Sequence, residues 1–338
     1  MFREYLELII GGHPLDEEQM VQMITEVLSG NVTDTQIGAM MAALATRGET
    51  CEELAGAAKA MRRMAHRIQS PGSIVVDTCG TGGDGAGTFN ISTTTAFVVA
   101  GCGVTVAKHG NRSVSSQCGS ADLLEALGVK IDVAPEIVEE ALLETGIGFL
   151  FAPVYHAAMR HAARARRDLG LRSIFNMLGP LTNPAGANCQ LLGVYAGELT
   201  EMFAKTLSHL GTGQAMVVHG HDGLDEISVC APTRISELKN GLIKTFDLSP
   251  EQFFGRLAKP GALTGGDSSD NAAITLDILG GRGGDKRNVV VINAAAALLC
   301  AGRAADFPEG IRLAEKSIDS GAAREKLDRL VNFTTENG

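Results

Sequence analysis

The chain has no tryptophan, and only 4% of its 338 residues are aromatic. Its core must therefore consist mainly of Ala, Leu, Val and Ile. Paired cysteines are also missing, because the seven cysteines are scattered and form no Cys-x-x-Cys motif. This pattern argues against disulfides and common zinc sites and predicts free thiols in a reducing compartment. We therefore expect a cytoplasmic protein.

Long hydrophobic runs and an excess of basic charge are absent as well. The longest apolar runs, such as 294–301, are far shorter than the roughly 20 residues that span a bilayer. The charged N-terminus resembles no signal peptide. The net charge of −10 argues against a nucleic-acid binder, although local basic groups can still bind an anionic substrate. We expect neither a nucleic-acid nor a membrane partner.

The pattern of apolar residues changes near a predicted hinge at 70–72 (Ser-Pro-Gly). Residues 1–68 read as helices, with a capping box at Thr33 and Gln36. From Ser73 onward strands alternate with helices, which predicts an α/β fold with a mainly parallel sheet. The segment 153–190 fits either part. The expected strands are 74–76, 104–107, 147–151, 191–195, 215–218 and a hairpin within 232–248; the expected helices are 93–101, 120–127, 270–280, 287–302 and 307–331.

A glycine-rich turn, GTGGDG at 80–85, follows the first predicted strand. It matches the weak GxGxxG pattern, but a dinucleotide site needs an acid after the second strand, where this chain has Lys108. No GxxxxGK[ST] motif is present either. The next helix begins NISTTT (90–95), more hydroxyl and amide groups than one N-cap requires. We favour a phosphate site over a structural turn and a simple cap.

A second polar loop, KHGNRSVSS at 108–116, follows the second strand, at the sheet edge where ligands bind in α/β folds. A charged loop is often only solvated, but its place beside the glycine turn favours a ligand. His109 fits either substrate positioning or loop support. The phosphate donors that this loop offers are Lys108, Arg112, Ser113, Ser115 and Ser116.

Two further motifs are ambiguous when taken alone. Asp225 and Glu226 lie in a Gly-containing loop after a later strand, which suits Mg²⁺ but also an ordinary acidic turn. Nearby His219 and His221 suggest zinc, without Cys partners at zinc spacing. The basic helix 155–168 reads as a solvated face, or as a source of arginines for a substrate carboxylate.

Taken together, the motifs resemble one family along essentially the whole chain. GTGGDG, TFNIST, KHGNR, SADLLEALGV, NMLGPLTNP and HGHDGLDEIS occur in the order and spacing of the anthranilate phosphoribosyltransferases. The resemblance implies a separate all-α N-terminal domain and a large α/β domain related to the pyrimidine nucleoside phosphorylases. It implies a small domain of residues 1–70, completed by about 168–190, and a large domain of residues 71–167 and 191–338.

The resemblance also implies the reaction. The family transfers the phosphoribosyl group of 5-phosphoribosyl 1-pyrophosphate (PRPP) to the amine of anthranilate, with Mg²⁺, in tryptophan biosynthesis. It uses no covalent nucleophile or strong base. Family members are commonly homodimers through the small domain. A separate glutamine amidotransferase of anthranilate synthase is a conceivable partner that the sequence does not test.

The site residues follow from the same resemblance. Cys79 and Met159 depart mildly from the family pattern, and the second leaves the outer anthranilate channel open. PRPP contacts are implied for Gly80, Gly83, Asp84, Thr88, Asn90, Ile91, Ser92, Thr93, Lys108, His109, Gly110, Asn111, Arg112, Ser113, Val114, Ser115, Ser116 and Ser120. Anthranilate contacts are implied for Gly80, His109, Asn111, Pro153, His156 and Arg166, and metal contacts for Ser92, Asp225 and Glu226.

Two other functions fit the same fold. A pyrimidine nucleoside phosphorylase-like enzyme would need neither the Asp225-Glu226 pair nor an aromatic-acid site. A non-catalytic nucleic-acid-binding relative would need a basic surface and a degraded metal motif. The net charge of −10 and the intact DGLDE sequence argue against the second alternative.

Overall fold

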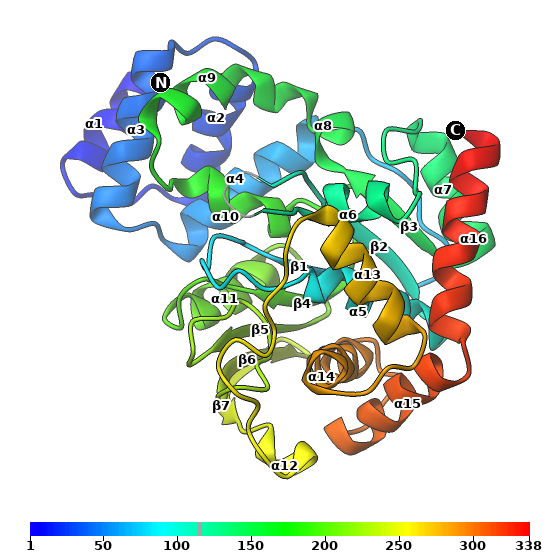
Figure 1. Ribbon diagram of the computed structural model, residues 1–338. Helices are drawn as coiled ribbons and strands as arrows, with labels where there is room; N and C mark the ends of the chain where they lie inside the picture. Colours follow the sequence, from blue (N-terminus) through cyan, green and yellow to red (C-terminus); the bar gives the residue numbers. More distant parts are fainter. Residues whose placement is uncertain (114–116) are drawn as a thin grey trace.

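The computed structural model describes residues 1–113 and 117–338 and shows a helical lobe beside a larger α/β lobe (Figure 1). Three of the N-terminal helices begin at capping boxes, including the predicted Thr33–Gln36 pair. Buried Met and Leu side chains then join these helices into one core. These helices are α1 (Phe2–Ile10), α2 (Glu17–Leu28), α3 (Asp34–Arg47) and α4 (Cys51–Met64).

The α/β lobe is built on a seven-stranded sheet of order β3-β2-β1-β4-β5-β6-β7. The first five strands in chain order are parallel, which confirms the mainly parallel sheet. The last two form the predicted antiparallel hairpin, with Asn240 and Gly241 at positive φ in its turn. The strands are β1 (Val75–Gly80), β2 (Thr105–Gly110), β3 (Ile147–Phe151), β4 (Cys189–Gly193), β5 (Gln214–Gly220), β6 (Thr233–Lys239) and β7 (Leu242–Leu248).

Helices cover both faces of the sheet. Helix α14 is apolar on nearly all sides and packs with α5 against one face. The predicted single helix 307–331 is wrong, because Gly321 adopts a φ of 80° and splits it into α15 and α16. One face carries α5 (Ile91–Gly101), α14 (Asp285–Cys300), α15 (Phe307–Asp319) and α16 (Ala322–Asn337), and the other carries α7 (Pro135–Thr145) and α11 (Leu199–His209).

The ambiguous middle segment runs through both lobes. After β3 the chain enters the helical lobe, where α9 (Arg160–Leu169) contacts α2 and α3, and α10 (Ile174–Leu178) contacts α3 and α4. It then returns to β4, so the chain passes between the lobes three times (Figure 1). No helix among the described residues is long and apolar enough to cross a membrane. The remaining helices are α6 (Ser120–Ala126), α8 (Ala152–Tyr155), α12 (Glu251–Phe254) and α13 (Ser268–Leu279).

The strand order reverses between β1 and β4. From β1 the chain proceeds outward to β2 and β3, and from β4 it proceeds outward in the other direction. Ligands of open α/β sheets bind at such a reversal, outside the carboxyl ends of the strands. In this protein the two strands end side by side, with Gly80 paired to Gly193.

Candidate functional site

Asp225 packs against the carboxyl ends of β1 and β4, where glycines leave the space that it occupies. A Cβ on Gly80 would lie 2.5 Å from the Asp225 Oδ2 atom, and a Cβ on Gly193 would overlap the Asp225 carbonyl oxygen. The Gly82 backbone N–H donates to Asp225 Oδ2 at 2.9 Å. The two strand-end glycines and the glycine turn therefore fix one predicted metal ligand at the point where the sheet order reverses.

Three acidic side chains gather at this point. Desolvation raises the pKa of Asp225 and of Glu226, and the charges of nearby carboxylates raise both further; Asp84 contributes to each shift. Such a like-charge cluster is costly unless a cation neutralises it. A hard divalent cation fits this donor set of carboxylate oxygens. Asp225 and Glu226 thus supply oxygen donors of the kind that Mg²⁺ prefers, and their role as its ligands stays a prediction.

Lys108 supplies a buried positive charge beside these acids. Its ammonium donates to the Thr78 carbonyl at 2.6 Å and to the Ser92 hydroxyl at 3.4 Å. Burial lowers its pKa, while Asp77 and Glu226 act in the opposite sense. The structure thus brings Lys108, Ser92 and Glu226 together, although they come from three separate motifs.

The start of α5 lies open toward the same edge. Asn90 occupies the N-cap position without a capping hydrogen bond from its side chain. Its amide instead donates to the Cys118 carbonyl and accepts from Asn271. The Thr93 hydroxyl is buried and has no hydrogen-bond partner among the described residues. This favours a ligand over simple capping. Two other predicted PRPP contacts have structural positions instead: Ile91 is buried in the core, and Thr88 forms an isolated β-bridge with Thr264.

The loop after β2 is bonded to side chains of α6. The Ser120 hydroxyl accepts from the Asn111 backbone N–H, and a Cβ on Gly110 would collide with that hydroxyl. Arg112 pairs with Asp122 and Glu125, and the Ser113 N–H donates to Asp122. Arg112 is therefore already neutralised by protein carboxylates. The predicted contacts Val114, Ser115 and Ser116 lie outside the described residues.

Two histidines of the predicted anthranilate site face each other. The rings of His109 and His156 have centroids 5.1 Å apart, and both Nε2 atoms are buried without a hydrogen-bond partner in the part of the chain that the structure describes. Burial lowers the pKa of His109 to about 3 and that of His156 to about 4. Both rings are thus neutral at pH 7. Pro153 lies in the short helix α8 that leads to His156.

Arg166 reaches a half-buried position on α9. Its guanidinium carbon lies 5.6 Å from the centroid of the Phe175 ring, and burial lowers its pKa. Among the described residues no carboxylate forms an ion pair with it, whereas Arg164 on the same helix pairs with Asp34 and Asp168. No hydrogen bond or ring contact joins Arg166 to His109 or Asn111. Arg160 and Arg167 of α9 form no ion pair with a described carboxylate either, but both are exposed, so Arg166 is the partly buried arginine of this helix that is available to an anion.

Sequence reasoning missed the buried groups that hold the site. Asp77 accepts from the His109 backbone N–H at 3.2 Å and from the Asn183 amide at 2.8 Å. Asn293 on α14 accepts from the Ile227 N–H and donates to the Ile227 carbonyl. It thereby fixes the residue after Glu226. The signal for Asp77 was an acid inside an apolar strand, and the signal for Asn293 was one amide in an apolar helix.

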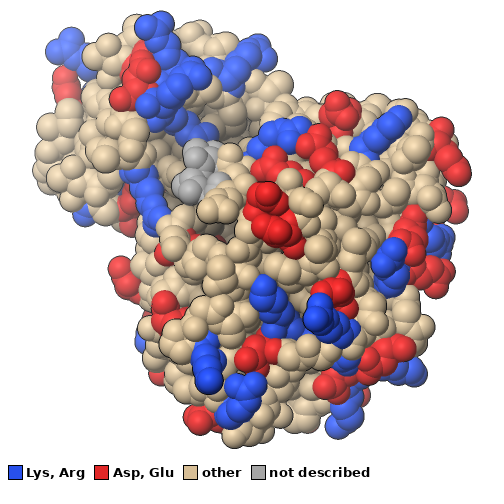
Figure 2. Space-filling model, in the orientation of Figure 1, with Lys and Arg blue, Asp and Glu red and all other residues tan. Residues whose placement is uncertain are grey.

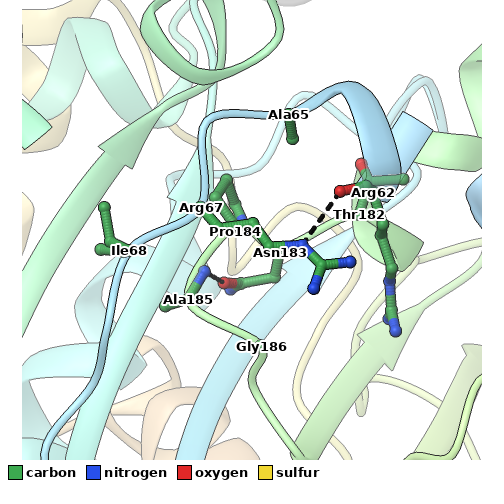
Figure 3. Close-up of a pocket in the computed structure, with 9 residues that line it drawn as sticks. All are labelled: Arg62, Ala65, Arg67, Ile68, Thr182, Asn183, Pro184, Ala185 and Gly186. Carbon is green, nitrogen blue, oxygen red and sulfur yellow. Dashed lines mark hydrogen bonds between the residues drawn. The ribbon is translucent and has the colours of Figure 1, made fainter.

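A cavity of about 250 Å³ lies between the segments 62–68 and 182–186 (Figure 3). Its walls come from two of the three chain passages between the lobes, 62–68 and 182–186. Asn183, which lines it, also bonds to Asp77. None of the predicted substrate or metal contacts lines this cavity, so it is not the candidate site. The molecular surface is hollowed where the lobes meet, with Lys and Arg side chains gathered on the helical side (Figure 2).

Comparisons with known proteins agree with this geometry. The chain matches the families described as "Glycosyl transferase family, a/b domain" over residues 72–324 and "Glycosyl transferase family, helical bundle domain" over residues 3–65. It is 66% identical to the anthranilate phosphoribosyltransferase of Syntrophobacter fumaroxidans over 100% of both chains. It is 63% identical to that of Desulfosudis oleivorans, also over 100% of both.

Solved structures give the same result. The Thermus thermophilus anthranilate phosphoribosyltransferase has a TM-score of 0.92 and 42% identity, with 98% of this chain and 99% of that chain covered. The Saccharomyces cerevisiae enzyme in complex with PRPP and Mg has a TM-score of 0.90 and 28% identity, covering 99% and 98%. The chain belongs to the anthranilate phosphoribosyltransferase family.

Proposed function

We propose that this chain transfers the phosphoribosyl group of PRPP to the amine of anthranilate. The products are N-(5-phosphoribosyl)anthranilate and pyrophosphate, in tryptophan biosynthesis. The observation that carries the proposal is the acidic cluster around Asp225, seated on Gly80 and Gly193 beside Lys108. A related enzyme from yeast, solved with PRPP and Mg, supports the same assignment.

PRPP occupies the edge of the sheet between the glycine turn and the start of α5. The hydroxyl groups of that helix start bind phosphate oxygens, favoured by the positive end of the helix dipole. Ser92, Asp225 and Glu226 would hold Mg²⁺, which would supply neutralisation of the charge on the departing pyrophosphate. Lys108 keeps the Ser92 hydroxyl oriented and limits the repulsion between the acids.

Anthranilate approaches from the helical side. Arg166 binds its carboxylate, since a guanidinium matches a carboxylate with two parallel hydrogen bonds. Asn111, at the border of the two substrates, and the neutral rings of His109 and His156 complete the channel. A neutral, buried imidazole accepts an aromatic ring without bringing a competing charge.

The chemistry requires no nucleophilic side chain. The bond from C1 to pyrophosphate weakens first, and the amine, neutral at pH 7, then attacks C1 from the opposite face. The protein contributes by aligning two substrates and stabilising the leaving charge. A phosphorylase would not need the Asp225-Glu226 pair, and a nucleic-acid binder would not need to retain it.

Several finer points belong to the same proposal. The small domain comprises residues 1–70 and about 168–190, and the large domain comprises 71–167 and 191–338. The packing of α10 on α3 and α4 supports a return to the small domain at about 168–190, whereas the packing of α9 (Arg160–Leu169) on α2 and α3 favours a return that begins nearer residue 160. We further propose a cytoplasmic homodimer whose lobes close over the substrates about the hinge at 70–72. Association with a separate glutamine amidotransferase of anthranilate synthase is left to experiment.

The test follows fluorescent phosphoribosylanthranilate with PRPP, anthranilate and Mg²⁺ present or omitted singly. Product should require all three. Asp225→Asn should raise the Mg²⁺ concentration for half-maximal rate at least about tenfold, because it removes one charged ligand. Asp247→Asn, in an exposed ion pair on β7, is the matched control. An unchanged Mg²⁺ profile in Asp225→Asn would reject the metal assignment, and no product from the wild-type protein would reject the function.

A further inference from the structure

The glycine turn after β1 is fixed from several sides. The Thr81 N–H donates to the Gly193 carbonyl at 2.9 Å, and the Thr81 hydroxyl accepts from the Tyr195 N–H at 3.2 Å. Gly82 donates to Asp225. All of these anchors belong to the α/β lobe and hold Thr81 and Gly82, the second and third residues of the turn.

The next residue is held from the helical side. Arg172 lies between α9 and α10, and its Nη2 donates to the Gly83 carbonyl. The same guanidinium lies over the Tyr195 ring, with 4.1 Å between Cζ and the ring centroid. Tyr195 follows β4 and also bonds to Thr81. One side chain from the segment 170–173 therefore joins the glycine turn to the end of a second strand.

Gly83 is the residue that permits this contact. Its φ is 75°, a conformation that other residues rarely adopt. A Cβ built on Gly83 would lie 2.5 Å from Arg172 Nη2. The backbone of the turn can therefore contact the guanidinium only because Gly83 has no side chain. Asp84, the next residue, interacts directly with the Asp225 carboxylate.

We propose that Arg172 is a positioning residue for PRPP, which clamps Gly83 and so sets where Asp84 and the turn meet the substrate and its metal. The inference rests on the proposed function and adds a residue outside the motifs that suggested it. Since Arg172 touches only the PRPP side, its loss should raise the KM for PRPP about tenfold, as expected for one charge-assisted hydrogen bond and one cation–π contact. The KM for anthranilate should change less than twofold.

The kinetic test compares Arg172→Ala, Arg172→Lys and the control Arg167→Ala, an exposed arginine of the same helical segment. Lysine keeps the charge but loses the planar stack, so its effect should be intermediate. Tyr195→Phe, which keeps the ring, should affect PRPP less than Tyr195→Leu. Arg172→Ala and Tyr195→Leu should be non-additive in a double-mutant cycle, because both break one contact.

A second readout does not depend on activity. Amide hydrogen exchange of the ligand-free protein should accelerate at residues 82–86 in Arg172→Ala and not in β5. A wild-type protein that makes no product would reject the proposed function. An active wild type combined with an unchanged PRPP KM in Arg172→Ala, or with equal rises of both KM values, would reject the clamp alone.

Discussion

At the scale of single residues, Arg166 is a partly buried cation without a carboxylate partner among the described residues. It is half buried and forms a cation–π contact with Phe175, yet no described carboxylate pairs with it. Removing a guanidinium from water without a counter-ion is costly, which is why its pKa is lowered. Under the proposed function, a substrate carboxylate bound to Arg166 would offset that cost.

Arg166→Ala should therefore raise the KM for anthranilate by roughly 10- to 100-fold, the range for a lost charged hydrogen-bond pair. The KM for PRPP should stay within about twofold of the wild-type value, because PRPP binds at the sheet edge. Steady-state kinetics with each substrate varied in turn measures both. Arg167→Ala is the exposed neighbour that serves as control, and equal effects on the two substrates would contradict the role of Arg166.

His156 makes a second prediction at this scale. Its pKa is about 4 in the folded protein, below the ordinary value of 6.5, so the unfolded chain takes up a proton first as the pH falls. The stability contributed by neutral His156 is present above pH 6.5 and is lost as the pH falls toward 4. Acids with raised pKa values, such as Asp77, act in the opposite sense, so the wild type alone does not isolate it.

We therefore compare the wild type with His156→Gln by urea denaturation at pH 7.5 and pH 5.5. The difference in the free energy of unfolding between the two proteins should shift by about 1 kcal/mol in favour of the variant at the lower pH. Taking the difference cancels the other titrating groups. A difference that is the same at both pH values would show that His156 takes up its proton equally easily in both states.

At the scale of elements, the ends of β1 and β4 depend on residues without side chains. Gly193→Ala would place a Cβ on the Asp225 carbonyl, so the acidic loop or the strand must shift. We expect the free energy of unfolding to fall by about 1–3 kcal/mol, as for overpacking, with at least a tenfold loss of activity. Gly213→Ala, whose Cβ would meet only Asn188 O at 3.5 Å, is the control. If the two variants behave alike, Gly193 does not position Asp225.

The elements themselves were largely predictable from the sequence. The strand at 147–151 agrees with β3 residue for residue, because its apolar run is uninterrupted. The predicted strand 74–76 proved too short, since β1 continues to Gly80 through Asp77 and Thr78. In a sequence, polar residues inside a strand are read as the end of that strand, unless the hydrogen-bond partners of their side chains are known. Those partners come from other segments: the Asn183 amide donates to the Asp77 carboxylate, and the Thr78 hydroxyl donates to the Ser92 carbonyl.

The same reasoning explains which parts of the site were found. Lys108, Ser92 and the acids 225–226 occur in dense polar motifs at strand or helix ends, and the sheet brings them together. Arg172 stands in no such motif and acquires its place only from tertiary packing against Gly83 and Tyr195. A lone arginine in a loop gives no sequence signal for a contact made across two lobes.

For the whole molecule, the exposed apolar side chains of α1 bear on the expected homodimer. Ile10 is 66% exposed on the helical lobe. If that lobe forms the dimer, Ile10→Glu places a charge in the interface and should convert the protein to monomers in analytical ultracentrifugation. Leu242→Glu, on β7 and 77% exposed, is the control and should leave the dimer intact. A monomeric wild type, or a fully dimeric Ile10→Glu, would reject this interface.

The three chain passages between the lobes have a consequence for synthesis on the ribosome. Helices α1 to α4 emerge first, but α9 and α10, which pack on α2, α3 and α4, follow only after β3. The N-terminal lobe thus has no complete core while β1, β2 and β3 are being made. A nascent chain stalled before residue 160 would expose the Met-rich and Ala-rich helix faces that α9 and α10 later cover. Such a chain is the kind of client that holding chaperones retain.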